Sequence, residues 1–144
     1  MTKILLPDVN LWLALAFESH GHHAQAKVWF DGVQPDQVCA FCRMTQQGFL
    51  RLATNAKAFQ DEAVTLDRAW QLYDAFLSDA NIAFLEEPAG IEVSWRKFTE
   101  RRTFSPKVWN DAYLAAFAEQ VAGTLVTFDR SMSQYASVAC TVLA

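Results

Sequence analysis

Three aspartates stand at positions that point to shared chemistry. Asp8 directly follows the apolar run KILLP, and Asp129 directly follows the apolar run TLVTF. Asp111 interrupts a row of small apolar residues in a stretch with helical spacing. Carboxylates that meet at one place repel one another until a hard cation lies between them, and Mg²⁺ and Mn²⁺ prefer oxygen ligands. The three residues therefore predict a divalent-metal site.

Asp111 is the most informative of the three. In the helix predicted from Pro106, residues 108, 111, 115, 118 and 122 share one face, and all but Asp111 are Val or Ala. Such a face is typical of close packing on a sheet, where an unpaired carboxylate would be strongly destabilising. Asp111 lies more than one turn beyond the helix start, so capping does not explain it. We expect a cation or several hydrogen-bond donors beside it.

Each aspartate also has a purely structural interpretation. Asp8 and Asp129 are suited to capping a helix or shaping a turn, and either one alone is explained as well by that role as by metal binding. Asp111 could instead pair with Arg51, which interrupts the apolar stretch GFLRLA. A shared site explains all three positions at once, and we therefore favour it.

The elements that must position these aspartates alternate between strand and helix. Short apolar stretches predict strands at 3–9, 37–42, 82–88, 124–128 and 139–143. Helical spacing predicts helices at 10–19, 21–32, 44–55, 65–78, 91–102 and 106–122. Asn10 is the expected N-cap of the first helix, and Ser105 followed by Pro106 is the expected start of the last.

This alternation predicts an α/β fold. Strands joined by crossover helices form a parallel sheet that is covered on both faces. Ligands of such sheets bind beyond the carboxyl ends of the strands, near the point where the strand order switches. Asp8 and Asp129 each end a predicted strand, so both carboxylates should project toward that rim.

Length, charge and cysteine count limit the class of protein. We interpret residues 1–144, of which 52% are hydrophobic, as a single domain. The absence of an export signal and of a membrane span predicts a cytoplasmic protein with no membrane partner. An odd number of cysteines, three, indicates reduced thiols. A net charge of −4 means that nucleic acid would need a local basic patch, such as the stretch 96–107, or metal ions.

Four motifs carry a resemblance to a known family. The stretches LLPDVNLWLALA, GFLRL, NDAYLAAFA and LVTFDR occur in this order, and 18 residues separate Asp111 from Asp129. Together they resemble the PIN-domain family, and most of all the VapC-type ribonuclease toxins of bacterial toxin–antitoxin pairs. The resemblance implies a three-layer α/β/α sandwich with a central, mostly parallel sheet of four to five strands. It also implies a Mg²⁺- or Mn²⁺-dependent endoribonuclease that hydrolyses RNA phosphodiester bonds, a homodimer and a cognate antitoxin protein.

The resemblance assigns roles to individual residues. Asp8, Asp111 and Asp129 would be the catalytic and metal-binding residues, and the bound metal would activate a water molecule. The second acid of the family is missing, because Gly48 stands in TQQG where a glutamate is expected three residues after the threonine.

Neutral residues could support the three acids. The neighbouring Gln47 or Gln46 could supply an amide oxygen in place of the missing glutamate. Asn10 and Thr127 are candidate hydrogen-bond donors to the carboxylates or to phosphate, although each is also an ordinary cap or strand residue.

Two other functions fit part of the pattern. A phosphatase of the haloacid dehalogenase type would use Asp8 as a nucleophile but needs a second acid where DVN has Asn10. A degenerate PIN domain that binds RNA or a protein without cleavage is favoured by Gly48 and opposed by the three retained acids. The C-x-x-C pair in CAFC should point to opposite faces of a strand, and HGHH is interpreted as a surface turn.

Overall fold

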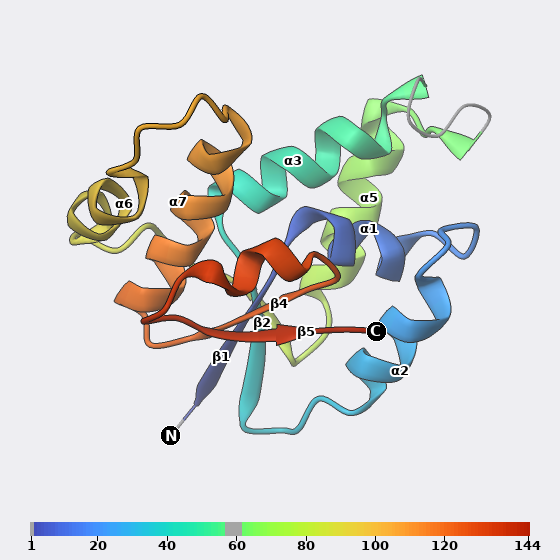
Figure 1. Cartoon of the computed structure of the whole chain (residues 1–144). Coiled ribbons are helices and arrows are strands. Elements are labelled where there is room, and N and C mark those ends of the chain that lie inside the picture. The colour runs from blue at the N-terminus through green and yellow to red at the C-terminus, as the bar shows by residue number, and fades with distance from the viewer. Residues whose placement is uncertain (1, 57–61) are drawn as a thin grey trace.

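A sheet of five strands forms the centre of the structure, a computed structural model that describes residues 2–56 and 62–144. The strands are β1 (Lys3–Pro7), β2 (Gln37–Phe41), β3 (Ile82–Phe84), β4 (Thr124–Thr127) and β5 (Ala139–Val142). They lie in the order β3-β2-β1-β4-β5, and every neighbouring pair runs parallel (Figure 1). The predicted parallel sheet is confirmed, and its strand order switches between β1 and β4.

Helices cover both faces of this sheet (Figure 1). One side carries α1 (Val9–Ala16), α2 (His23–Asp31), α3 (Arg43–Ala53) and α5 (Leu66–Leu77). The other side carries α6 (Ile91–Thr99), α7 (Lys107–Gln120) and the short 3-10 helix η2 (Arg130–Gln134). The expected three-layer sandwich is therefore confirmed. None of the helices in the described ranges has the length and apolarity that a membrane crossing requires.

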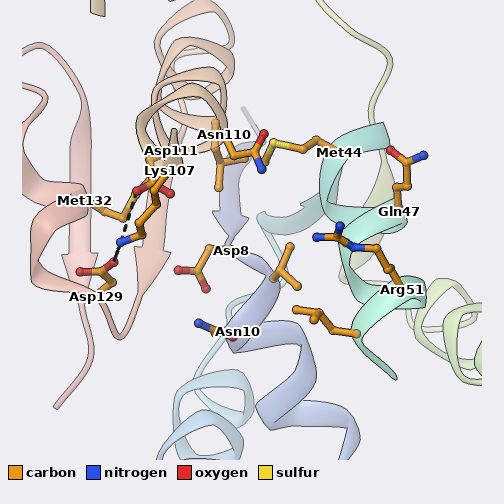
Figure 2. Close-up of a pocket in the computed structure, with 14 residues that line it drawn as sticks. Asp8, Asn10, Met44, Gln47, Arg51, Lys107, Asn110, Asp111, Asp129 and Met132 are labelled. Carbon is orange, nitrogen blue, oxygen red and sulfur yellow. Dashed lines mark hydrogen bonds and ion pairs between the residues drawn. The ribbon is translucent and has the colours of Figure 1, made fainter. Parts of the chain in front are cut away.

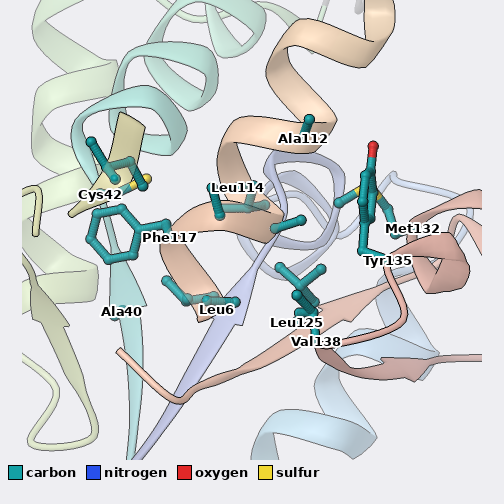
Figure 3. Packing of buried hydrophobic residues seen from close by; sticks show 14 residues of the cluster. Leu6, Ala40, Cys42, Ala112, Leu114, Phe117, Leu125, Met132, Tyr135 and Val138 are labelled. Atoms are coloured by element: carbon teal, nitrogen blue, oxygen red, sulfur yellow. The ribbon is translucent and has the colours of Figure 1, made fainter. Parts of the chain in front are cut away.

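Alternation along the strands divides the apolar residues between two cores. Leu6 and Leu125 belong to the core shared with α7 (Figure 3), whereas Phe41 stacks on Trp12 of α1 with ring centroids 3.8 Å apart. Cys39 and Cys42 belong to opposite cores, as expected, although Cys42 lies beyond β2 at the N-cap of α3.

Small residues let α7 approach the sheet closely. Ala115 and Ala118, on the predicted face, are fully buried, and so are Ala112 and Ala116 beside them. The buried surface of α7 is wider than the predicted face because α6 packs on its other side (Figure 1). The helix ends at Gln120, so the prediction that it extends to residue 122 is wrong.

Two predicted N-caps differ from those in the structure. Asn10 is not the N-cap of α1; Asp8 is, and its side chain accepts a hydrogen bond from the backbone N–H of Leu11 at 3.0 Å. At α7 the first helical residue is Lys107 and Pro106 occupies the N-cap position, one residue later than predicted. The first correction matters for function, because it gives Asp8 a structural role as well as a place in the candidate site.

A half-buried acidic side chain ties α6 and the segment after η2 to α7. The Glu119 carboxylate accepts hydrogen bonds from Ser94 at 2.7 Å, from Lys97 at 2.9 Å and from Ser137. Burial by itself would raise the pKa of Glu119, but these three donors outweigh it and lower the pKa to about 2. A carboxylate with a lowered pKa stabilises the folded state above its ordinary pKa and loses this contribution as the pH falls toward the folded value.

We expect Glu119→Gln to lower the free energy of unfolding by about 2 kcal/mol at pH 7. The difference in the free energy of unfolding between wild type and Glu119→Gln should shrink as the pH falls from about 5 to about 3. In this range Glu119 of the unfolded wild type binds a proton, which favours unfolding of the wild type and leaves Glu119→Gln unaffected. Urea denaturation at several pH values measures this. Glu92→Gln, which removes an exposed glutamate paired with Arg96 on α6, is the control and should change stability little at any pH. A deficit in Glu119→Gln that does not vary with pH would contradict the expectation.

Candidate active site

The carboxyl ends of β1 and β4 lie side by side at the switch in strand order, and the candidate site is built there. Asp8 is the first residue after β1, and Asp129 is the second residue after β4. Asp111 lies in the second turn of α7. All three side chains line one cavity of about 520 Å³ (Figure 2). The structure thus brings together the aspartates that the sequence singled out.

Asp8 is held firmly by two hydrogen bonds. One carboxylate oxygen caps α1, and the other accepts a hydrogen bond from the Thr127 hydroxyl at 2.5 Å. The same hydroxyl accepts a hydrogen bond from the backbone N–H of Asp129 at 2.9 Å. Burial raises the pKa of Asp8, and the nearby charges of Asp129 and Asp111 add to this, against the lowering effect of the two hydrogen bonds. The site therefore holds a carboxylate for which the charged form is disfavoured.

Asp129 is stabilised as an anion. Its Oδ2 accepts a hydrogen bond from the Lys107 ammonium at 2.7 Å, and its Oδ1 accepts hydrogen bonds from the backbone N–H and the hydroxyl of Ser131 at 2.9 and 2.8 Å. The Lys107 contact, followed by those of Ser131, lowers the pKa of Asp129 to about 2. Asp129 thus caps η2 while it faces the cavity.

Asp111 has a cation beside it, but the cation is not Arg51. Lys107 lies one turn earlier on α7, and its ammonium is 3.5 Å from Oδ2 of Asp111 (Figure 2). The alternative pairing with Arg51 is not formed. Burial raises the pKa of Asp111, Lys107 opposes this, and Asp129 adds to it. The spacing of Lys107 and Asp111, four residues along one helix, is a signal for this contact that the sequence analysis missed.

Lys107 joins two of the three acids across the cavity mouth. Its ammonium contacts both Asp111 and Asp129, so it lies where the two negative charges meet. In the described part of the chain, no three His, Cys, Asp or Glu side chains stand close enough to share one metal ion. The donor set nevertheless fits a hard divalent cation, because it consists of carboxylate oxygens, and such a cation would compete with Lys107 for the same oxygens.

Comparison with known proteins adds an independent finding. The PIN domain family matches residues 5–138. The chain belongs to the PIN-domain family. Ribonuclease VapC41 of Mycobacterium tuberculosis is 44% identical over 98% of this chain and 99% of its own length. Ribonuclease VapC38 of the same organism is 31% identical over 86% of this chain and 84% of its own length.

Solved structures show the same fold as this PIN domain. VapC20 of M. tuberculosis, described as a sarcin-ricin loop cleaving toxin, matches with a TM-score of 0.68 at 17% identity, over 92% of this chain and 95% of its own. VapBC-1 of nontypeable Haemophilus influenzae matches with a TM-score of 0.70 at 12% identity, over 96% of this chain and 97% of its own. The family assignment also removes the haloacid dehalogenase alternative, which belongs to a different class of α/β protein.

The supporting residues of this PIN domain are placed unevenly. Thr127 is fully engaged with Asp8 and Asp129, and the exposed Asn10 lines the cavity near Asp8 (Figure 2). Gln47 also lines the cavity from α3, but its side chain is turned away from the aspartates (Figure 2). Gln46 is buried and accepts a hydrogen bond from Arg43 at 2.6 Å, so it does not replace the missing glutamate.

Gly48 has a packing role where α3 crosses the start of α1. A Cβ atom at this position would lie 2.7 Å from Cγ2 of Val9, which is closer than van der Waals contact permits. Val9 immediately follows Asp8, so the helix crossing and the site are coupled. The position that many PIN domains give to a second acid is therefore filled here by a valine side chain from the neighbouring helix.

We expect Gly48→Glu to lower the free energy of unfolding by about 1–3 kcal/mol, because the new side chain collides with Val9. Adding Val9→Ala removes the colliding methyl groups, so the double variant should be more stable than the sum of the single changes predicts. Urea denaturation of the four proteins measures this coupling. Gly21→Glu is the control, since nothing lies within 4 Å of a Cβ atom there. Strict additivity of the two changes would show that the close contact has no energetic consequence.

Proposed function

We propose that this PIN domain is a metal-dependent endoribonuclease that acts as the toxin of a toxin–antitoxin pair in the cytoplasm. The observation that supports it most is the gathering of Asp8, Asp111 and Asp129 around one cavity at the switch in strand order. The 44% identity to Ribonuclease VapC41 over nearly the whole of both chains gives the activity its class. RNA is accordingly the substrate, and a phosphodiester bond is the bond that is hydrolysed.

The three aspartates would hold Mg²⁺ or Mn²⁺. When bound, such an ion supplies an acidified water and compensates the charge that develops on phosphate during hydrolysis. Thr127 acts as a positioning residue, since its hydroxyl fixes Asp8 and is itself fixed by the backbone of Asp129. Ser131 orients Asp129 in the same way. These bonds hold two carboxylates in fixed orientations, which reduces the reorganisation needed when the charge of the site changes.

Lys107 has two roles in this proposal. Its ammonium lowers the pKa of Asp129 and opposes the rise that burial causes in the pKa of Asp111. When the carboxylates bind a divalent cation, the lysine side chain must move, and its 64% exposure leaves it room in solvent to do so. At the cavity mouth the displaced ammonium would be available to an RNA phosphate.

The proposal includes protein partners. The solved structures with this fold include VapBC2 of Rickettsia felis bound to promoter DNA, with a TM-score of 0.68 at 11% identity. We infer that this chain likewise binds a cognate antitoxin and forms a homodimer. Phe104, just before α7, has a relative solvent accessibility of 103%, and Trp109, in the first turn of α7, has one of 58%. Large apolar side chains exposed in this way are typical of protein interfaces.

A degenerate PIN domain that binds RNA without cleavage is the second candidate. The packing of Gly48 against Val9 favours it, because no second acid can stand there without rearrangement. The three retained acids oppose it, since half-buried carboxylates repel RNA unless a cation accompanies them.

We expect the purified chain to cut total bacterial RNA at discrete sites in Mg²⁺ or Mn²⁺ and to stop when EDTA is added. Asp8→Ala, Asp111→Ala and Asp129→Ala should each lower the cleavage rate at least about 100-fold, because each removes a proposed metal ligand. Gel analysis of the RNA measures the rate, and circular dichroism checks that each variant is folded.

Asp67→Ala is the matched control, since Asp67 is exposed on α5 and lies outside the cavity. Cleavage that persists in EDTA or in all three variants would contradict a metal-dependent mechanism. RNA binding by a folded wild type that does not cleave would instead support the degenerate PIN domain.

A further inference from the structure

The cavity has two walls of opposite charge. The aspartates and Lys107 stand at the start of α1, on α7 and on the segment after β4, whereas the wall formed by α3 carries Arg51, Gln47 and Gly48. Figure 2 shows Arg51 and Asp8 on facing sides of the cavity, with the guanidinium directed inward. Because Arg51 lies on the side of the cavity opposite the acids, pairing with those acids does not explain its position.

The donors of Arg51 have no partner among the described residues. Its guanidinium makes no hydrogen bond or ion pair with any residue in the ranges 2–56 and 62–144. The one acid proposed as its partner, Asp111, is paired with Lys107 instead. A guanidinium presents five N–H donors in a rigid planar fork, which matches the paired oxygens of a carboxylate or a phosphate.

The neighbouring positions keep this wall free of negative charge. Gly48 stands one turn before Arg51 on α3 and carries no side chain, and a Cβ atom added there would collide with Val9. Gln47 is neutral, and the three acids of the cavity all lie on other elements. An anion that enters between the walls would therefore meet repulsion from the acidic wall only, and the guanidinium would attract it.

Arg51 also has a purely structural interpretation. It lies in the last turn of α3, where a cation interacts favourably with the helix dipole. That interaction requires only a positive charge near the helix end and is small for an exposed side chain. It does not account for a guanidinium directed into the cavity, and it predicts effects on stability alone.

We propose that Arg51 forms a phosphate-binding subsite that holds the RNA backbone against α3, opposite the three aspartates. The inference rests on the proposed function for the identity of its ligand. A phosphodiester has two non-bridging oxygens that a guanidinium can hold with two parallel N–H···O hydrogen bonds. Such a contact fixes the strand across the cavity without reading a base, so it contributes affinity and position but no sequence preference.

The test compares wild type, Arg51→Ala and Arg51→Lys, with Arg68→Ala as the matched control. Arg68 is exposed on α5, outside the cavity, so this variant loses the same charge elsewhere. Binding of a fluorescein-labelled, 20-nucleotide single-stranded RNA of mixed sequence is followed by anisotropy at several salt concentrations. Ca²⁺ is present as the cation, and a gel confirms that the RNA stays intact. Cleavage in Mn²⁺ and the thermal shift produced by Mn²⁺ are measured in parallel.

We expect Arg51→Ala to weaken RNA binding about tenfold and to reduce the slope of log affinity against log salt by about 0.7, the value for one lost phosphate contact on a single strand. Arg51→Lys should keep the slope and lose part of the affinity, because an ammonium supplies the charge but not the paired hydrogen bonds. Where wild type cleaves, kcat/KM of Arg51→Ala should fall at least about tenfold. The Mn²⁺ thermal shift of Arg51→Ala should equal or exceed that of wild type.

An affinity, slope and cleavage rate of Arg51→Ala that match wild type would overturn the subsite and leave the proposed nuclease intact. Loss of the Mn²⁺ thermal shift, or an equal loss of RNA binding in Arg68→Ala, would also overturn it, since Arg51 would then act on the metal or through net charge. A salt slope that depends on Arg51 in a wild type that does not cleave would support the subsite while the nuclease proposal fails.

Discussion

Three carboxylates gathered at one edge of a sheet repel one another, and the rest of the site is arranged around that repulsion. Lys107 offsets part of this repulsion because its ammonium contacts both Asp111 and Asp129. Thr127 and the backbone at the start of α1 stabilise Asp8 by donating hydrogen bonds to its carboxylate. Burial still raises the pKa of Asp8 and Asp111. The site is thus stable enough to form in the folded chain, and in the proposed function a divalent cation would relieve the remaining repulsion.

The fold brings the acids together through packing that is specific to this chain. The buried alanines of α7 let the helix lie close to the sheet, which places Asp111 above the ends of β1 and β4. On the other side, Gly48 lets α3 cross α1 at Val9, and this contact takes the room of a second acid. The result is a cavity with an acidic wall and a basic one, which suits a ligand that is itself an anion bound with a cation.

The sequence predicted the fold and the three aspartates because both depend on local patterns. Apolar runs that alternate with helical stretches predict parallel strands joined by crossover helices, but they do not predict the order of the strands in the sheet. A parallel sheet was nevertheless enough to place Asp8 and Asp129 at one rim, because each follows a strand. The wrong N-cap, Asn10 in place of Asp8, arose because both residues are good caps and only the end of β1 distinguishes them. The spacing of Lys107 and Asp111 on one helix was a usable signal, but the contact of Lys107 with Asp129 and the collision between Gly48 and Val9 depend on side-chain positions across elements, which sequence spacing alone does not determine.

The central claim is that Asp8, Asp111 and Asp129 bind one divalent cation in competition with Lys107. Calorimetric titration of the metal-free protein with Mn²⁺ tests it most directly, using wild type, Asp111→Asn and Lys107→Met, with Lys27→Met on α2 as the charge control. We expect binding by wild type, a large loss in Asp111→Asn and, because a competing charge is removed, a gain on the order of tenfold in Lys107→Met that Lys27→Met does not share. Equal Mn²⁺ affinity in wild type and Asp111→Asn, or weaker binding in Lys107→Met, would contradict the account.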